Sequence, residues 1–206
     1  MSELAIIDYG MGNLRSVQKA IERVGGEARI VSRPLDLLEF SGVILPGVGS
    51  FPAAARRLRR RGWIKPIKEA AERIPFLGIC LGLQLFFQRS EEGEPARGLG
   101  LLEGEVVRFP PEVKVPHMGW NQLRFPLPHP IFAGLDQETF VYFVHSYYPR
   151  VKDASATAAT TDYGVQFASA VAKGNLVGVQ FHPEKSQAAG LKILGNFLRM
   201  TREAEP

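Results

Sequence analysis

Cysteine is nearly absent from this sequence of 206 residues, which contains only Cys80. A single cysteine excludes an intramolecular disulfide and is typical of proteins from a reducing compartment. The sequence also lacks a run of 18 apolar residues, which a membrane-spanning helix would require. Its first residues, Met1-Ser2-Glu3, do not show the basic segment and apolar stretch of a secretory signal. These absences predict a cytoplasmic protein without a membrane partner.

Two common ligand signatures are missing as well. One cysteine and four dispersed histidines do not give the spacing of metal ligands, so neither a metal nor another cofactor is expected. Gly10 and Gly12 follow a predicted strand, but Arg15 occupies the third glycine position of a dinucleotide-binding G-x-G-x-x-G loop. The loop Tyr9–Asn13 remains a candidate for contact with a ligand or partner, because it should lie at the carboxyl edge of the sheet.

Positive charge is in moderate excess, with a net charge of +4 and a pI near 9.3. Much of the excess lies in the run Arg56–Arg61, and basic runs can bind nucleic acid. No aromatic residues are interleaved in this run to stack on bases, and alanines precede it in a helical context. The run is therefore interpreted as the solvated face of a helix, and no nucleic-acid partner is expected.

The first ninety residues alternate between strand and helix patterns. A helical spacing of apolar residues from Leu14 to Val24 follows the glycine loop, and Gly25-Gly26 ends it. Such alternation is typical of a parallel sheet covered on both faces. The expected strands are Leu4–Asp8, Ala28–Val31, Gly42–Leu45 and Pro75–Ile79.

The second half changes to short β-type runs with few helices between them. A hairpin turn is expected at Lys173–Asn175, and a final amphipathic helix should pack back on the sheet. The predicted class is an α/β fold with a central mixed, mostly parallel sheet flanked by helices, extended by antiparallel strands in the second half. We expect one domain spanning residues 1–206. The expected strands are Glu105–Phe109, Phe140–Tyr147, Val165–Ala172 and Leu176–Phe181.

Cys80 lies between Gly78 and Gly82 at the end of an apolar run. This pattern predicts a nucleophile elbow, in which a strand turns sharply into a helix, here expected over Leu83–Gln88, and exposes one reactive side chain. Glycine is needed on both sides because larger side chains would contact the neighbouring strand and helix. The positive end of the helix dipole favours a thiolate. Since a lone cysteine is often only a small buried apolar residue, the prediction depends on its partners.

A cysteine nucleophile needs a base and usually a group that orients this base. His182 directly follows a predicted strand, so it should lie at the same sheet edge as Cys80. Glu184 can hydrogen-bond the imidazole, and Pro183 restricts the chain between them. His129, by contrast, lies in a proline-rich segment and is interpreted as an exposed loop residue.

Acyl transfer also requires hydrogen-bond donors for the developing oxyanion. By analogy with hydrolase elbows, the backbone N–H of Leu81, directly after the nucleophile, can supply one donor. The loop Pro46–Gly49 can supply the other, although its glycines would also suit a plain tight turn.

Gly78-Ile-Cys-Leu-Gly82 with Gln84, followed far downstream by His182-Pro-Glu184, resembles the catalytic core of the class-I, triad-type glutamine amidotransferases. Other segments are similar to the glutaminase subunits of imidazole glycerol phosphate synthases, which act in histidine biosynthesis. The resemblance extends from about residue 4 to the final helix and implies a flavodoxin-like α/β fold. The segments that carry it are Asp8–Leu14, Leu45–Phe51, Pro116–Asn121, His145–Tyr147 and Gln180–Ser186.

The resemblance implies a role for each matching residue. Cys80 would attack the side-chain amide of glutamine and form a glutamyl thioester, His182 would transfer protons, and Glu184 would orient His182. The other implied roles are the oxyanion hole (Gly47, Val48 and Gly49, together with Leu81), glutamine binding (Gln84, Ser146 and Tyr147) and the subunit interface (Asn13, Trp120 and Lys185).

The resemblance also implies a partner, a cyclase subunit with a (β/α)₈ barrel that forms a heterodimer with this chain. Ammonia would pass to the cyclase without entering bulk water. There it would react with phosphoribulosyl formimino aminoimidazole carboxamide ribonucleotide to give imidazole glycerol phosphate and aminoimidazole carboxamide ribonucleotide. The Gly47–Gly49 loop would stay misaligned until the partner is loaded. Trp120 suits an interface anchor, but a core tryptophan fits the sequence equally well.

Two alternatives remain at the level of sequence. A stand-alone glutamine or γ-glutamyl hydrolase on the same fold would be active without a cyclase. A catalytically silent binding or regulatory module would tolerate the loss of Cys80, His182 or Glu184, yet all three are present.

Overall fold

The computed structural model describes residues 3–34 and 37–204. Its centre is a seven-stranded sheet with the order β10-β11-β12-β4-β3-β1-β2. Five neighbouring strands are parallel, and β10 and β11 add an antiparallel edge. The parallel strands are β1 (Glu3–Ile7), β2 (Glu27–Val31), β3 (Gly42–Gly47), β4 (Phe76–Cys80) and β12 (Leu176–Val179), and the antiparallel ones are β10 (Thr157–Asp162) and β11 (Gln166–Lys173).

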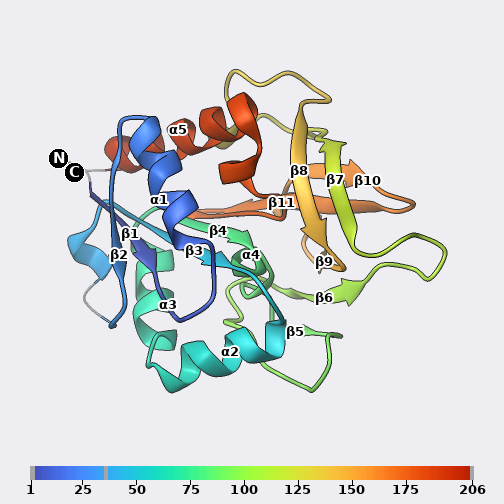
Figure 1. Cartoon of the computed structure of the whole chain (residues 1–206), viewed down its shortest axis with the longest axis horizontal. Helices are drawn as coiled ribbons and strands as arrows, with labels where there is room; N and C mark the ends of the chain where they lie inside the picture. The colour runs from blue at the N-terminus through green and yellow to red at the C-terminus, as the bar shows by residue number, and fades with distance from the viewer. Residues whose placement is uncertain (1–2, 35–36, 205–206) are drawn as a thin grey trace.

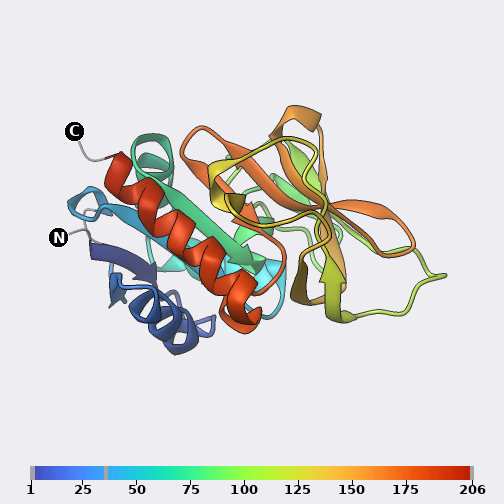
Figure 2. The ribbon, with the colours of Figure 1, turned by 90° about the horizontal axis from the view of Figure 1, so that it is seen from above.

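Helices cover both faces of this sheet (Figures 1 and 2). Because alternate residues of a strand point to opposite faces, Leu4 and Ile6 of β1 pack toward one pair of helices, and Ala5 and Ile7 toward the other. The first pair is α1 (Leu14–Arg23) and α5 (Gln187–Glu203), and the second is α2 (Phe51–Arg60) and α3 (Ile64–Arg73).

The second half of the chain adds two small sheets beside the central one (Figure 1). One contains β5 (Arg89–Ser90), β6 (Gly104–Arg108) and β9 (Tyr147–Val151). The other is an antiparallel ribbon of β7 (His117–Gln122) and β8 (Phe140–His145). Short connecting helices are α4 (Leu81–Gln84), η1 (Leu37–Glu39), η2 (Pro130–Phe132), η3 (Ala154–Ala156) and η4 (Pro183–Lys185).

The predicted fold class is confirmed, and the hairpin at Lys173–Asn175 joins β11 to β12 as expected. Most strand boundaries differ from the prediction by one or two residues, and two predicted segments were wrong in extent. The single run Phe140–Tyr147 is divided at Ser146, because β8 pairs with β7 whereas β9 pairs with β6 in a different sheet. The helix expected over Leu83–Gln88 is only the turn Leu81–Gln84.

The early end of α4 has a structural reason. Leu85, Phe86 and Phe87 are consecutive and all fully buried. The backbone carbonyls of Leu85 and Phe86 accept hydrogen bonds from N–H groups of residues 99–102, so they are not available to continue the helix. The chain instead leaves the helix and turns, with backbone bonds from Phe86 to Leu83 and from Phe87 to Gln84.

The arginine run lies on α2 and just after it, and all five of its arginines are exposed while Leu58 between them is buried. The interpretation as a solvated helix face is therefore confirmed. Across residues 3–34 and 37–204, no helix is both long and apolar enough to cross a membrane.

Candidate active site

The elbow predicted at Cys80 is present. β4 ends at Cys80 and α4 begins at the next residue. Cys80 has φ 54° and ψ −109°, a conformation that costs a non-glycine residue about 1–3 kcal/mol. A Cβ at Gly82 would lie 1.8 Å from the Leu45 carbonyl oxygen, and one at Gly78 would lie 2.4 Å from the ring of Phe86. The close approach of strand and helix therefore requires both glycines, as the sequence predicted.

His182 and Glu184 form a buried pair. The imidazole Nδ1 of His182 lies 2.8 Å from the Glu184 carboxylate, and their side chains are only 2% and 1% exposed. The backbone N–H of His182 donates to the Tyr142 carbonyl, which fixes the start of η4. Because Nδ1 donates to a carboxylate, Nε2 is the nitrogen left for proton transfer. It has no hydrogen-bond partner within the described part of the chain.

The surroundings of His182 favour its charged form. Burial opposes protonation, but the interactions with Cys80 and Glu184 outweigh it and raise the pKa of His182 to about 9. An imidazolium beside the sulfur favours a thiolate, which is the nucleophilic form of cysteine. The arrangement is thus suited to attack by sulfur followed by proton donation from His182.

A cavity of about 310 Å³ brings most of the predicted site residues together. Both Cys80 and His182 line it, and Glu184 supports it from behind through His182. Gly47 is absent from the lining; it is the last residue of β3, where it pairs with Cys80, and a Cβ there would lie 2.5 Å from the Tyr9 hydroxyl. The other predicted residues in the lining are Val48, Gly49, Leu81, Gln84, Ser146, Tyr147 and Lys185.

Gln84 is buried and its amide nitrogen is already engaged. Nε2 donates to the Tyr147 carbonyl (3.0 Å) and to Oε1 of Gln180 (3.1 Å). Gln180 in turn places its Nε2 3.7 Å from the Cys80 sulfur. Gln180 is a site residue that was not predicted from the sequence. The available signal was its position two residues before His182, directly after the strand β12 that pairs with β4.

Two further histidines lie at the cavity: His145 is part of its lining, and His117 lies behind His145. His117 Nδ1 is 3.0 Å from His145 Nε2, and His145 Nδ1 is 2.8 Å from the Tyr147 carbonyl. Burial lowers the pKa of His117 to about 4 and that of His145 to about 3, so both are neutral at neutral pH. These two histidines are brought together only by the register between β7 and β8, so their pairing could not be predicted from the sequence.

The outer face of the β7–β8 ribbon exposes apolar side chains beside the cavity. Trp120 is 45% exposed, which excludes the alternative of a core tryptophan, and Met118 and Phe140 are 62% and 53% exposed. The Lys185 ammonium lies 5.9 Å from the ring of Tyr142, the cross-strand neighbour of Trp120. Asn13 is exposed at the start of α1 and does not line the cavity.

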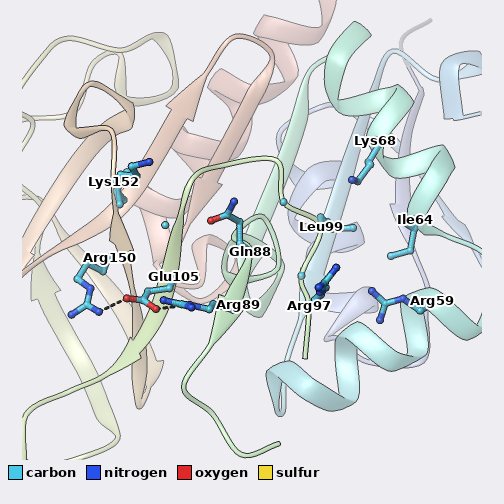
Figure 3. A pocket seen from close by; sticks show the side chains of 14 residues that line it. Arg59, Ile64, Lys68, Gln88, Arg89, Arg97, Leu99, Glu105, Arg150 and Lys152 are labelled. Carbon is cyan, nitrogen blue, oxygen red and sulfur yellow. Dashed lines mark hydrogen bonds and ion pairs between the residues drawn. The ribbon is translucent and has the colours of Figure 1, made fainter. Parts of the chain in front are cut away.

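A larger cavity, of about 890 Å³, lies elsewhere and is strongly basic (Figure 3). Glu105 lies between Arg89 and Arg150 and pairs with both. None of the predicted site residues lines this cavity. Among residues 3–34 and 37–204, no three histidine, cysteine or acidic side chains are grouped as metal ligands.

Comparison with known proteins identifies the family. Residues 5–200 match the family model of glutamine amidotransferase class-I. The imidazole glycerol phosphate synthase subunit HisH of Moorella thermoacetica is 53% identical over 205 residues, covering 99% of this chain and 98% of the relative. The HisH subunit of Syntrophotalea carbinolica is 52% identical, covering 94% of this chain and 98% of the relative.

Solved structures share the fold at lower identity. A putative GMP synthase protein from Thermoplasma acidophilum superimposes with a TM-score of 0.75 at 22% identity, covering 98% of this chain and 95% of the other. PurLQS from Thermotoga maritima gives 0.76 at 20% identity, covering 98% of each chain. The chain therefore belongs to the class-I glutamine amidotransferases and, within them, to the HisH subunits of imidazole glycerol phosphate synthase.

Proposed function

We propose that this amidotransferase of histidine biosynthesis hydrolyses glutamine through Cys80, His182 and Glu184 and delivers the ammonia to a cyclase subunit. The observation that carries the proposal is the shared cavity, in which a cysteine on a strained elbow and a buried, carboxylate-oriented histidine meet. A single amidotransferase domain over residues 1–206 would suffice for this activity.

The reaction follows from the positions of these groups. The Cys80 thiolate attacks the side-chain amide carbon of glutamine, and His182 gives its Nε2 proton to the departing ammonia. The resulting glutamyl thioester is then hydrolysed: His182 takes a proton from water, the hydroxide attacks the thioester carbon, and glutamate leaves. Glu184 holds the imidazole by Nδ1 and stabilises its positive charge.

Backbone N–H groups supply the oxyanion hole in this proposal. Leu81 directly follows the nucleophile and lines the cavity, and Val48 and Gly49 line it from the loop after β3. Gly49 has φ 98°, a region that glycine tolerates and that lets the loop change its peptide orientation at low cost. Gly47 contributes by close packing, since Tyr9 and Leu81 leave it no room for a side chain.

Glutamine binding is assigned to three residues of the cavity lining. Ser146 and Tyr147 line it at the break between β8 and β9. The Oε1 of Gln84 accepts no hydrogen bond from the described residues, so it is the part of that amide available to the substrate.

The partner is placed on the apolar outer face of the β7–β8 ribbon. Exposed aromatic side chains flanked by polar residues are typical anchors of subunit interfaces. This face adjoins the cavity mouth through Val144 and Lys185, which line the cavity. A (β/α)₈-barrel cyclase seated there would receive ammonia directly from the site, and imidazole glycerol phosphate and aminoimidazole carboxamide ribonucleotide would be its products.

The interface assignment has its own test. Trp120→Ala should weaken binding of the cyclase about 30-fold or more, as expected for a central aromatic anchor, whereas Leu127→Ala should leave it unchanged. Leu127 is a matched control because it is 65% exposed and lies outside the ribbon. Lys185→Ala should reduce stimulation by the cyclase more than it reduces folding stability. Equal affinities for both tryptophan and leucine variants would place the partner on another face.

The central experiment measures glutamate release from glutamine by the chain alone, with the cyclase, and with the cyclase plus its ribonucleotide ligand. We expect little activity alone and a large rise in the complete mixture, because an unformed oxyanion hole costs about 100- to 1,000-fold in rate. High activity alone, unaffected by the cyclase, would instead identify a stand-alone hydrolase. Silence in every mixture would identify a binding module.

A further inference from the structure

A chain of buried amide groups joins the Tyr147 carbonyl to the Cys80 sulfur, and the function proposed above uses only the free oxygen of Gln84 in it. Gln84 lies in the middle of this chain and Gln180 at its end, against the nucleophile. Gln180 is fully buried and Gln84 is 5% exposed. Because polar groups in such a place are costly unless they are paired, the arrangement needs an explanation.

The direction of every donor in this chain follows from one fixed acceptor. The Tyr147 carbonyl can only accept, so the atom of Gln84 that faces it must be the amide nitrogen. The second hydrogen of this nitrogen then points to Oε1 of Gln180, 3.1 Å away. Consequently the amide nitrogen of Gln180 is the atom that faces Cys80, at 3.7 Å from the sulfur.

A second chain of donors ends on the same carbonyl. His145 Nδ1 lies 2.8 Å from it and must therefore carry a proton, which leaves Nε2 of His145 as an acceptor. Nδ1 of His117 then donates to that acceptor, and Nε2 of His117 accepts from Asn121. Both acceptor positions of the Tyr147 carbonyl are thus occupied. A movement of this carbonyl would therefore break its bond with His145 as well as its bond with Gln84.

We propose that Gln180 is a further catalytic residue, whose amide donates a hydrogen bond to the Cys80 thiolate, and that Gln84 is a positioning residue that fixes the orientation of this donor. The proposal rests on the proposed role of Cys80 as the nucleophile. It gives the thiolate two stabilising neighbours of different kinds, the charged His182 on one side and a neutral, fixed donor on the other.

The amide of Gln180 offsets an unfavourable contact of the Cys80 sulfur. The Val144 carbonyl oxygen lies 4.0 Å from Sγ and can accept a hydrogen bond from the thiol but repels a thiolate. A donor of fixed direction on the other side compensates for that repulsion.

The test measures the thiolate directly, by the rate of Cys80 alkylation with iodoacetamide as a function of pH. Gln180→Met keeps the size of the side chain but removes the donor. Gln180→Glu keeps an acceptor for Gln84 but turns an acceptor toward the sulfur. A hydrogen bond to a charged group changes an equilibrium by about 10- to 100-fold, so the midpoint should move about one to two pH units higher in Gln180→Met and further in Gln180→Glu.

Ser169→Ala is the matched control. Ser169 is fully buried on β11, its backbone carbonyl pairs with the N–H of Gln180, and its hydroxyl has no partner among the described residues. The control should keep the wild-type midpoint. Gln84→Met leaves Gln180 in place but removes the group that orients it. This variant should move the midpoint in the same direction as Gln180→Met, by a smaller amount. If both Gln180 variants fail to fold, the midpoint of Gln84→Met tests the proposal.

An unchanged midpoint in the folded variants would overturn the proposal, because a merely structural amide would alter stability without altering thiolate formation. Alkylation does not require glutamine turnover, so the two proposals can fail separately. If the wild-type mixture released no glutamate but the midpoint still moved in Gln180→Met, the proposed function would fall and the hydrogen bond to the sulfur would stand. If glutamate release were normal and the midpoint fixed, only the role of Gln180 would fall.

Discussion

The cavity at Cys80 has histidines on two sides, and the two sides differ in charge although both are buried. His182 is 2% exposed and has its pKa raised to about 9, whereas His145 is 6% exposed and has its pKa lowered to about 3. His182 is bonded to a carboxylate and its pKa is raised by the Cys80 sulfur as well, while His145 pairs with a neutral imidazole and a backbone carbonyl.

The comparison shows that burial alone does not decide the charge of a histidine. Desolvation lowers the pKa on both sides, and only an anionic partner reverses the direction. The charged side is therefore suited to proton transfer, and the neutral side to holding amide groups in a fixed orientation. If His145 were also protonated, the two imidazolium ions would compete for the single thiolate and repel each other.

Removal of the nucleophile should give the largest effect. Cys80→Ala should lower glutamate release from glutamine by about 10,000-fold or more, as for other nucleophiles of triads. The same change should lower the pKa of His182 toward its ordinary value, because Cys80 helps to raise it. Glutamate assays and NMR titration of the histidine ring protons measure the two effects. Synthesis from free ammonia by the loaded cyclase should persist in the variant, and retained glutaminase activity would contradict the elbow assignment.

Removal of the Glu184 charge should make His182 resemble the neutral His145. Glu184→Gln preserves an oxygen that can accept from Nδ1 but removes the negative charge 2.8 Å away. We expect glutamine turnover to fall about 100- to 10,000-fold and the pKa of His182 to fall with it. The pH dependence of turnover and an NMR titration of His182 check this result. A turnover rate within a few fold of wild type would show that Glu184 does not orient the base.

The charged side could be predicted from sequence, and the neutral side could not. Cys80 is identified by its glycines, and His182 by the strand before it, because both signals are local in the chain. The pairing of His117 with His145 depends on the register of two strands separated by a long irregular segment. The direction of the Gln84 and Gln180 amides depends on one carbonyl, whose position follows from the break between β8 and β9.

The same distinction applies to the fold. Apolar periodicity predicted the parallel strands and their helices, since each strand and helix buries residues according to its own repeat. The helix expected over Leu83–Gln88 ends early because the backbone carbonyls of Leu85 and Phe86 bond to residues 99–102 and not to the next helical turn. Such pairing with a later segment is a property of the assembled fold and leaves no periodic signal in the chain.

The neutral and the charged histidines should also change the stability of the protein in different pH ranges. Below pH 6.5 the unfolded chain protonates His117 and His145 while the folded chain keeps them neutral, so acid lowers the free energy of unfolding. Between pH 6.5 and about 9 the folded chain keeps the proton of His182 and the unfolded chain loses it, so the stability that His182 contributes falls as pH rises. Each group contributes up to about 1.4 kcal/mol per pH unit.

Urea unfolding between pH 5 and pH 9 separates the two limbs, because carboxylates titrate mostly below this range. His145→Gln should flatten the acid limb and keep the alkaline one. Glu184→Gln should do the reverse, since it removes a cause of the raised pKa of His182. Parallel curves for wild type and both variants would contradict the assignment of charge to the two sides.

The smallest effect is expected at a carboxylate that pairs with cations at the surface. Glu105 pairs with Arg89 and Arg150 at the basic cavity, where both arginine side chains are well exposed. Solvent and salt screen such pairs, so Glu105→Gln should shift the Tm by no more than about 2 °C, and this shift should vanish in about 1 M salt. Glutamate release should not change, because Glu105 does not line the cavity of Cys80. Thermal unfolding at low and high salt, and glutamate release, should be measured for Glu105→Gln and Glu184→Gln side by side. If the Glu105 variant lost as much activity as the Glu184 variant, the influence of a carboxylate on activity in this protein would not depend on its burial beside the nucleophile.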